Sequence, residues 1–470
     1  MMNRPHVVII GGGFSGTAVA IHLARLTTEP LHITVVEPRA TLGGGVAYST
    51  FEAAHRINVP AARMQLSGDE KGDFDRWYRQ QQAFRQDPDA LRPDGAVYPQ
   101  RSQFGHYLAE KFAQAGQLRA DVQLHHHRSE AVSWKEGEVV TADGAHLKAD
   151  ITILAVSHPP PALPRQLLSL AEHPALIANP WSAGALDQIP ADASVAIIGT
   201  GLSMADVVAS LSLRGHHGPL LAFSRRGQLS RDNLSGEWPE WTLPLLSPNA
   251  TARQWLRHIR NEVQRASAQQ LPWQRVLDEV RAQGQTIWQG FSLTEQRRFQ
   301  RHLRSWWNVY RYRIAPQLSQ VIGQRQQQGT LTVLAARAQT VEASGEQLTL
   351  RLKTRKGDSQ SHQLDYLIVT TGPAHADLTD SQPLLSQLRQ QGLIKPDALH
   401  LGIAVDAHSH VLNAEDGAEA RILISGPAAR GRFGELMGLP QVADHALAVA
   451  QETLNTLKTL AHRRCPVTTS

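Results

Sequence analysis

The sequence has few of the features that define several large classes of protein. Its 470 residues include a single cysteine, Cys465, which excludes an internal disulfide and a Cys-x-x-Cys redox pair. It has no run of about 18 apolar residues, so we expect no membrane-spanning helix and no membrane partner. Only Met1 to Pro5 precede the first apolar run, and this segment is too short for a signal peptide. Together these absences predict a cytoplasmic protein.

Charge is also sparse, and its sign is only weakly biased. Charged residues make up 19% of the chain and hydrophobic residues 41%, a balance that is typical of globular proteins. The formal net charge is +5, and between residues 251 and 313 twelve arginines accompany only four acidic residues. A nucleic-acid partner would need a broader basic surface, so none is expected. The length predicts two or three domains.

A glycine-rich turn of the pattern Gly-x-Gly-x-x-Gly follows the first apolar run. The run His6–Ile10 is typical of a strand, the turn spans Gly11–Gly16, a helical pattern follows, and a second strand is expected over Ile33–Glu37. In this order of strand, turn, helix and strand, the pattern predicts a dinucleotide site. A glycine-rich turn without a ligand is the alternative interpretation.

Each glycine of this turn has a physical role in such a site. Gly11 permits the tight turn, Gly13 leaves room for a pyrophosphate at the helix N-terminus, and Gly16 lets the helix pack on the strand. The carboxylate of Glu37 would accept hydrogen bonds from a ribose diol. The predicted cofactor contacts here are Gly11, Gly13, Phe14, Ser15, Gly16 and Glu37.

A second and weaker turn begins at Gly199. It follows the apolar run Ser194–Ile198 and precedes an expected helix over Leu202–Leu213, but Met204 occupies the position of the third glycine. The next expected strand, Leu220–Phe223, leads to two arginines in place of an acid. Guanidinium groups suit a 2′-phosphate, which favours NADPH over NADH, and solvated arginines in a polar turn are the alternative. The predicted contacts are Gly199, Gly201, Leu202, Ser203, Arg225 and Arg226.

The order of these signals predicts an α/β fold with two Rossmann-like dinucleotide-binding domains, the first of them discontinuous, and a helical insert. Two turns imply two ligands, and the simplest assignment gives FAD to the first turn and NADPH to the second. The expected boundaries are 1–190 for the first part of the FAD-binding domain, 191–235 and 320–345 for the NADPH-binding domain, 236–319 for the insert, and 346–470 for the second part of the FAD-binding domain. Later strands are expected over Leu331–Leu334, Leu348–Leu352 and Leu367–Thr370, and a last helix over Pro440–Leu460.

Two further segments contain candidate site residues. The stretch Leu42–Ser67 combines glycines with small polar residues and would either line a flavin ring or act as loop scaffold. In the expected insert, Trp306–Arg313 joins aromatic rings to guanidinium groups, which would either clamp an anionic ligand or form a packed stripe. The candidate cofactor contacts are Gly45, Tyr48, Asn58, Met64 and Ser67. The candidate substrate contacts are Gln65, Trp307 and Arg311, and no catalytic side chain is predicted.

The histidines do not form a metal-binding pattern. His125–His127 has no cysteine or pair of carboxylates near it, and a solvated strand end explains it better, so no metal is expected. His158 would either reach the flavin crevice or form hydrogen bonds within a turn.

Beyond the two turns, the chain resembles the bacterial FAD-NAD(P)-binding protein family over nearly its whole length. The motifs that carry the resemblance are Gly43–Tyr48, Asn58–Ala61, Tyr98–Arg101, Gly199–Asp206, Ser224–Gly227, Thr370–Pro373, Gly426–Pro427, Arg430–Gly431 and Glu435. The resemblance implies a cofactor contact at Gly426 and a substrate contact at Arg101. The family is similar in layout to flavin-dependent N-hydroxylating monooxygenases, and some relatives act on amino acids such as aspartate. One departure is that Ala155–His158 replaces the Ala-Thr-Gly motif of those enzymes.

The residues and the resemblance together predict an FAD-dependent oxidoreductase that is reduced by NADPH, most simply a monooxygenase. Hydride would pass to FAD, the reduced flavin would capture O2 as a peroxide, and oxygen would pass to a small amine- or carboxylate-bearing substrate. Two alternatives stay open: an NAD(P)H reductase or dehydrogenase without oxygen insertion, and a flavin-bound sensor or scaffold. The expected partners are a small-molecule substrate and O2, and a homo-oligomer also stays open.

Overall fold

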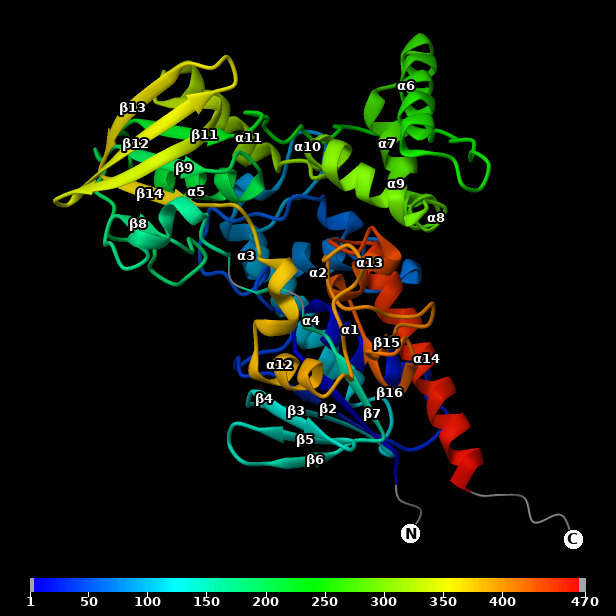
Figure 1. The fold of residues 1–470 in the computed structure, drawn as a ribbon. Helices are drawn as coiled ribbons and strands as arrows, with labels where there is room; N and C mark the ends of the chain where they lie inside the picture. Colours follow the sequence, from blue (N-terminus) through cyan, green and yellow to red (C-terminus); the bar gives the residue numbers. More distant parts are fainter. Residues whose placement is uncertain (1–3, 157, 160, 465–470) are drawn as a thin grey trace, which may run out of the picture.

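Two sheets, each with a glycine-rich turn at the end of a parallel strand, organise the chain (Figure 1). The computed structural model describes residues 4–156, 158–159 and 161–464. Ser157 of the Ala155–His158 segment and the single cysteine, Cys465, lie outside the described residues. Within the described ranges, no helix has the length and apolar character needed to cross a membrane.

The first sheet has the strand order β15-β16-β7-β1-β2-β3, and all its neighbours are parallel except β15 and β16. Because successive side chains of a strand point to opposite faces, Val7 and Ile9 enter one core whereas Val8 and Ile10 enter another. Both faces of the sheet are therefore covered. The strands are β1 (His6–Ile10), β2 (Leu31–Val36), β3 (Val122–His127), β7 (Ile151–Leu154), β15 (His410–Leu412) and β16 (Ala418–Ile424).

Helices cover one face of this sheet, and a small second layer of strands covers the other. On the first face, α1 (Phe14–Leu26) packs against α4 (Arg101–Ala115) and the long C-terminal helix α14 (Gln441–Arg464). On the other face, α12 (Pro383–Gln390) packs against β4. The small antiparallel sheet consists of β4 (Ala131–Lys135), β5 (Glu138–Thr141) and β6 (His146–Lys148). Shorter helices are α2 (Asp73–Gln80), α3 (Gln82–Gln86) and α13 (Arg430–Phe433).

The second sheet has the order β13-β12-β11-β10-β9-β14-β8. Its neighbouring strands β11, β10, β9, β14 and β8 are parallel to one another. At the other edge, β12 pairs antiparallel with β11, and β13 pairs antiparallel with β12. Two helices, α5 (Leu202–Leu213) and α11 (Pro316–Gln327), pack against each other beside it. The strands are β8 (Leu176–Ile177), β9 (Val195–Ile198), β10 (Leu220–Ser224), β11 (Leu331–Ser344), β12 (Gln347–Thr354), β13 (Ser359–Leu364) and β14 (Tyr366–Val369).

The predicted boundary at residue 345 is wrong for three strands. The segment 346–470 was expected to complete the first sheet, yet β12, β13 and β14 all belong to the second. The cause is local pairing: β11 turns directly into β12, and Leu348, Leu350 and Leu352 bury one side of that hairpin. Only β15, β16 and the helices that follow return to the first sheet. Likewise β8, inside the segment 1–190, pairs with β14 of the second sheet.

A group of helices stands apart from both sheets, within the segment where a helical insert was predicted (Figure 1, upper right). Its first helix begins with a capping box, in which Thr251 Oγ1 accepts a hydrogen bond from Gln254 N and the Gln254 side chain accepts one from Thr251 N. The insert helices are α6 (Ala252–Ala268), α7 (Trp273–Ala282), α8 (Gly284–Gln289), α9 (Leu293–Arg298), the π-helical turn Phe299–Leu303 and α10 (Arg304–Arg311).

Candidate active site

The first glycine turn is open at one glycine and closely packed at another. Gly13 is the N-cap of α1, and a Cβ built there would come no closer than 3.4 Å to another atom, the Cα of Gly45. A Cβ at Gly16 would instead collide with the carbonyl oxygen of Gly11. The helix N-terminus is therefore accessible in front of Gly13, as a pyrophosphate requires, while Gly16 permits the helix to pack on the sheet.

Glu37 lies at the end of β2 with an exposed fraction of 3%. Its Oε2 accepts a hydrogen bond from Gly12 N at 2.8 Å, and its Oε1 accepts one from Arg39 Nη1 at 2.9 Å. The carboxylate thus fixes the glycine turn. It also occupies the position predicted for a ribose acceptor, a contact that stays a prediction.

The loop that begins at Gly43 packs directly on the glycine turn. Gly45 has φ +50°, and a Cβ built on it would lie 3.0 Å from Gly13 Cα, so glycine favours this close approach of two backbones. Tyr48 packs edge-on against Phe104 with ring centroids 4.9 Å apart, and Phe14 stacks on the same ring at 5.9 Å. Burial raises the pKa of Tyr48 to about 12, so its hydroxyl is neutral.

The other predicted contacts of this segment lie in different surroundings. Met64 is buried in the core with an exposed fraction of 3%, whereas Gln65 and Ser67 are half-buried. Asn58 Oδ1 accepts a hydrogen bond from Ala315 N at 3.1 Å, where the chain leaves the insert. Asn58 therefore holds the insert against the first domain, and its cofactor contact stays a prediction.

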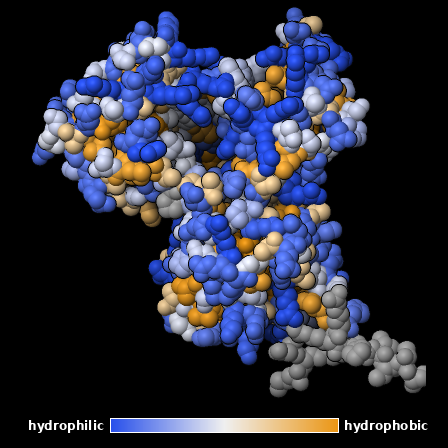
Figure 2. All heavy atoms as spheres, viewed as in Figure 1, coloured by the Kyte–Doolittle hydropathy of each residue, from blue (hydrophilic) through white to orange (hydrophobic). Residues whose placement is uncertain are grey.

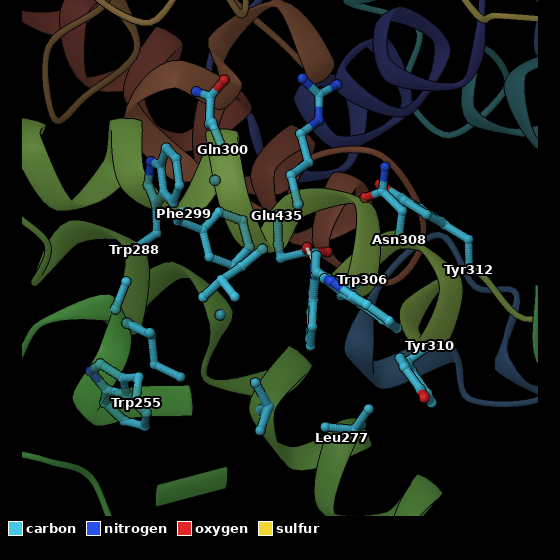
Figure 3. Close-up of a pocket in the computed structure, with 18 of the residues that line it drawn as sticks. Trp255, Leu277, Trp288, Phe299, Gln300, Trp306, Asn308, Tyr310, Tyr312 and Glu435 are labelled. Atoms are coloured by element: carbon cyan, nitrogen blue, oxygen red, sulfur yellow. Dashed lines mark hydrogen bonds between the residues drawn. The ribbon is translucent and has the colours of Figure 1, made fainter. Parts of the chain in front are cut away.

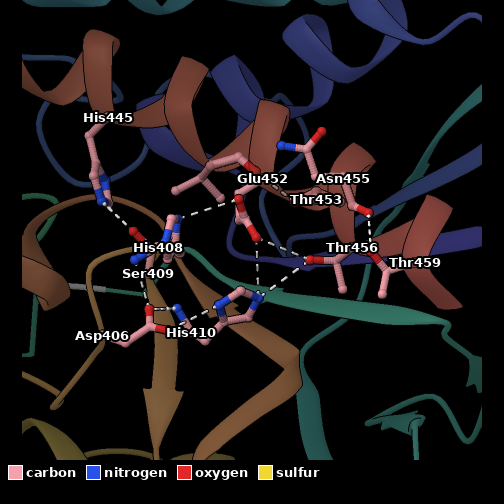
Figure 4. Close-up of polar contacts among 11 residues, drawn as sticks. Asp406, His408, Ser409, His410, His445, Glu452, Thr453, Asn455, Thr456 and Thr459 are labelled. Carbon is pink, nitrogen blue, oxygen red and sulfur yellow. Dashed lines mark hydrogen bonds and ion pairs between the residues drawn. The ribbon is translucent and has the colours of Figure 1, made fainter.

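The C-terminal part of the chain reaches the start of α1 through Gly426, which has φ +91°. A Cβ at Gly426 would collide with Ser15 Oγ, and Gly426 N donates a hydrogen bond to His445 Nδ1 at 3.1 Å. Since Nδ1 accepts, Nε2 carries the proton and donates to Ser409 Oγ at 3.0 Å (Figure 4). Burial lowers the pKa of His445 to about 4, so this histidine is neutral at pH 7.

The second glycine turn has the same division between packed and open positions. A Cβ at Gly199, where φ is +123°, would collide with Thr370 Oγ1. Gly201 is the N-cap of α5, and a Cβ there would meet nothing within 4 Å. Met204 is fully buried at the position of the third glycine, as the sequence predicts. The N-terminus of α5 is therefore open to a phosphate.

A strongly basic cavity of about 1140 Å³ lies beside the second turn. No acidic residue is part of its wall within the described ranges. Arg225 is exposed, and the guanidinium of Arg226 lies 5.0 Å from the centre of the Trp306 ring. Such a cavity favours a phosphorylated ligand. Its cationic wall residues are Arg225, Arg226, Arg301, Arg304, Arg337, Lys353 and Arg355.

A second cavity, of about 1210 Å³, lies between the insert and the segment around α13. Aromatic and aliphatic side chains make up most of its wall, among them Trp255, Leu277, Trp288 and Phe299 (Figure 3). Figure 2 shows a hollow between the two upper lobes of the molecule, with hydrophobic residues at its bottom. Arg304 lines both this cavity and the basic one, so the two are adjacent.

The structure brings only one of the predicted aromatic and arginine substrate contacts to this cavity. Trp307 lines it and donates from Nε1 to Glu435 Oε1 at 2.6 Å. Arg311 donates from Nε to Glu435 Oε2 at 2.7 Å and is not among the wall residues. Arg101 lies elsewhere, with Nη2 2.8 Å from Asp206 Oδ1. Both arginines thus have carboxylate partners within the protein, and their substrate contacts stay predictions.

Two histidines lie on the two connections between the sheets, with ring centroids 5.7 Å apart. His158 follows β7 and His375 follows β14. Burial, with a smaller contribution from Arg430, lowers the pKa of His158 to about 4 and that of His375 to about 3. Both rings are therefore neutral at pH 7. Neither Nδ1 has a hydrogen-bond partner among the described residues, so a turn hydrogen bond at His158 Nδ1 is not seen.

The triple-histidine tract forms the end of β3. His126 Nε2 lies 2.9 Å from the carbonyl oxygen of Glu37, and His127 Nε2 lies 3.2 Å from Asp143 Oδ2. In the part of the chain that the structure describes, no group of His, Cys, Asp and Glu is arranged to hold a metal ion.

Sequence reasoning missed several residues of these cavities. Arg337 lies in β11 and Arg355 directly follows β12, and a strand pattern alone gives no sign that they would line one cavity with Arg225. Arg430 and Glu435 were named only as parts of the family resemblance, and no site contact was predicted for them. Their place near the first turn is visible only in the structure, where Gly426 of the same segment lies against Ser15.

Residues 8–159 match a protein-family model described as FAD-NAD(P)-binding. This segment holds the first glycine turn, Glu37 and the loop that packs on the turn. Fold and site thus define a protein with an FAD-NAD(P)-binding domain at its N-terminal end. A comparison with curated protein sequences found no match.

Solved structures with this fold cover nearly the whole chain. The reduced form of ornithine hydroxylase from Pseudomonas aeruginosa aligns with a TM-score of 0.64 and 15% identity, over 97% of this chain and 100% of that one. L-lysine 6-monooxygenase from Pseudomonas syringae aligns with a TM-score of 0.62 and 17% identity, over 96% and 99%. Ornithine N-hydroxylase from Kutzneria sp. 744, with reduced FAD, NADP+ and L-ornithine, aligns with a TM-score of 0.60 and 15% identity, over 98% and 100%. The chain therefore has the fold of these N-hydroxylating flavin monooxygenases.

Proposed function

We propose that this protein is an NADPH-dependent flavin monooxygenase that hydroxylates the nitrogen atom of an amine. The observation that carries the proposal is the presence of three sites in one chain: an open turn for one dinucleotide, an open turn with a basic cavity for another, and an apolar cavity that shares Arg304 with the basic one. The shared fold with ornithine and lysine hydroxylases supports this reading of the three sites.

The residues of the first turn fit FAD. Gly13 leaves the N-terminus of α1 open to a pyrophosphate, and Gly45 and Gly426 bring two further backbone segments to the same end of the helix. Bound FAD would accept a hydride from NADPH and use the electrons to activate O2. The protein's own contribution would be to orient both dinucleotides and to keep water from the reacting atoms.

The residues of the second turn fit NADPH. Gly201 offers an open helix N-terminus for the pyrophosphate, and Arg225 and Arg226 lie at the end of the next strand, where a 2′-phosphate is recognised in such folds. Arg301 and Arg304 would add contacts from the insert. The insert would thus touch both the cofactor and the substrate.

The proposed reaction is balanced as RNH2 + O2 + NADPH + H+ → RNHOH + NADP+ + H2O. A new N–O bond forms, one atom of O2 enters the product, and the other leaves as water. The partners are then an amine, O2 and NADPH, all of which the cytoplasm supplies.

Isotope labelling tests this proposal directly. The FAD-loaded protein would be incubated with NADPH, 18O2 and a panel of primary amines, and products would be analysed by mass spectrometry alongside a hydrogen peroxide assay. A hydroxylamine that carries one 18O atom is the expected product. NADPH consumption that yields only hydrogen peroxide with every amine would identify a reductase or oxidase, and no consumption at all would favour a sensor or scaffold.

A further inference from the structure

The insert helices α6, α7, α8 and α10 supply much of the wall of the apolar cavity. Along α6, Trp255, Ile259 and Val263 recur every four residues, a spacing that places them on one face. Leu277 of α7 and Trp288 of α8 line the same space (Figure 3). These side chains belong to the hydrophobic cluster of the insert or pack against it, and they also line a cavity of about 1210 Å³.

The cavity offers no unpaired carboxylate to a ligand. Glu435 is the single acidic wall residue within the described ranges, and it already accepts hydrogen bonds from Trp307 Nε1 and Arg311 Nε. Glu262 of α6 lies outside the wall and pairs with Arg265 at 2.8 Å. A second ammonium group on a substrate would therefore find no counter-charge here.

Positive charge, by contrast, is available on the same wall. Arg304 is exposed, and its guanidinium forms no hydrogen bond or ion pair with any residue that the structure describes. Arg430 has an exposed fraction of 5%, and its Nε donates to the carbonyl oxygen of Leu401 at 3.1 Å. Burial, and next the charge of Arg304, lower the pKa of Arg430 to about 10, so it still carries its charge at pH 7. These guanidinium groups would repel a substrate with two positive charges.

We propose that the substrate class is a monoamine whose remaining part is a bulky apolar group, and that the insert helices hold this apolar part. The inference rests on the proposed amine hydroxylation and narrows its substrate. Short diamines would be poor ligands, because they bring a second ammonium group into an apolar cavity whose unpaired charges are positive. The apolar part would instead gain roughly fourfold in affinity for each methylene buried.

The matched probes are pentylamine, octylamine and cadaverine, which differ in chain length or in one terminal amino group. Their binding to the FAD-loaded protein would be measured by calorimetry, with NADP+ present. We expect octylamine, which has three more methylenes, to bind on the order of 60-fold more tightly than pentylamine, with a negative heat-capacity change, and cadaverine to bind more weakly than pentylamine.

Two substitutions on α6 locate the binding. Ile259→Trp would fill the cavity and is expected to weaken octylamine binding at least tenfold, whereas Arg257→Trp, at an exposed position outside the wall, should leave it unchanged. Reduction of the bound flavin by NADPH would show that each variant is folded. Leu277→Trp serves as the second cavity-filling variant if Ile259→Trp does not retain FAD.

The binding results separate this inference from the proposed function. Tight octylamine binding that is lost in Ile259→Trp would support the inference even if no hydroxylamine were formed. Cadaverine binding as tightly as octylamine would overturn it, even if cadaverine were hydroxylated. Octylamine binding that is unchanged in both cavity-filling variants would also overturn it.

Discussion

Arg101 and Asp206 form a buried ion pair that joins the two dinucleotide domains. Arg101 begins α4 beside the first sheet, Asp206 lies in α5 beside the second, and Nη2 is 2.8 Å from Oδ1. The exposed fractions are 7% and 2%, so neither charge is solvated. Arg101 Nε also donates to the carbonyl oxygen of Arg56 at 2.8 Å. The pair therefore fixes the orientation of one domain relative to the other.

Removing one partner should destabilise the protein more than removing both. Arg101→Ala would leave the Asp206 carboxyl buried without a cation, and we expect the free energy of unfolding to fall by about 3–5 kcal/mol. The double variant Arg101→Ala/Asp206→Ala should lose less than the sum of the two single changes. Urea titrations of the four proteins measure this coupling, and additive losses would show that the two residues do not interact.

Two glycines of the first turn should separate cofactor binding from folding. Gly13 has φ −71° and room for a Cβ, so Gly13→Ala should leave the melting temperature of the apoprotein nearly unchanged while weakening FAD binding at least tenfold. Gly16→Ala should instead lower the melting temperature, because its Cβ collides with Gly11. Flavin absorbance and thermal melts test both. An FAD content in purified Gly13→Ala equal to that of the unchanged protein would refute the placement of the pyrophosphate.

The choice of nicotinamide cofactor should depend on the arginines after β10. In the double variant Arg225→Ala/Arg226→Ala, the KM for NADPH is expected to rise about 10- to 100-fold while the KM for NADH changes little, because only NADPH carries the 2′-phosphate. Arg253→Ala/Arg257→Ala, at two exposed positions on α6, is the matched control for loss of two positive charges. An equal rise for both cofactors would mean that these arginines do not read the 2′-phosphate.

The buried His445 should make the free energy of unfolding depend on pH. Its pKa is about 4 in the folded protein and about 6.5 when unfolded, so between these values the unfolded chain binds a proton that the folded chain does not. Stability from this group is complete above pH 6.5 and falls as the pH decreases toward 4, by up to about 3 kcal/mol. His445→Gln should lose this part of the pH dependence. Urea titrations from pH 7.5 to 4.5 compare the two proteins, and parallel curves would contradict the expectation.

Local patterns predicted the elements that carry the two turns because those elements are defined by neighbours in the sequence. The strand over His6–Ile10 and the helix over Leu202–Leu213 have the predicted bounds, since a buried parallel strand and a glycine turn leave strong local signals. Sheet membership was harder, because β14 pairs with β9 only after a long excursion through the insert. No local pattern distinguishes which sheet such a strand joins.

In the candidate site, too, local features could be predicted from the sequence and long-range contacts could not. The backbone of each glycine turn was predictable from spacing, whereas the partners of long side chains were not. Arg101 was expected at the substrate and pairs with Asp206, and Arg311 pairs with Glu435, because a buried guanidinium requires a carboxylate that the sequence places far away. Spacing alone cannot indicate which of several distant acids meets it.

The closeness of His158 and His375 also bears on how this architecture can be rearranged. The chain leaves the first domain near one of these residues and returns near the other, so the second domain and the insert together form a cassette whose two ends lie side by side. Cassettes with adjacent ends can be exchanged between homologous hosts at little cost in loop-closure entropy. Grafting this cassette onto the first domain of a protein with the same fold would transfer the second glycine turn and the insert helices together as one genetic unit, while the part of the apolar cavity wall around α13 would stay with the host.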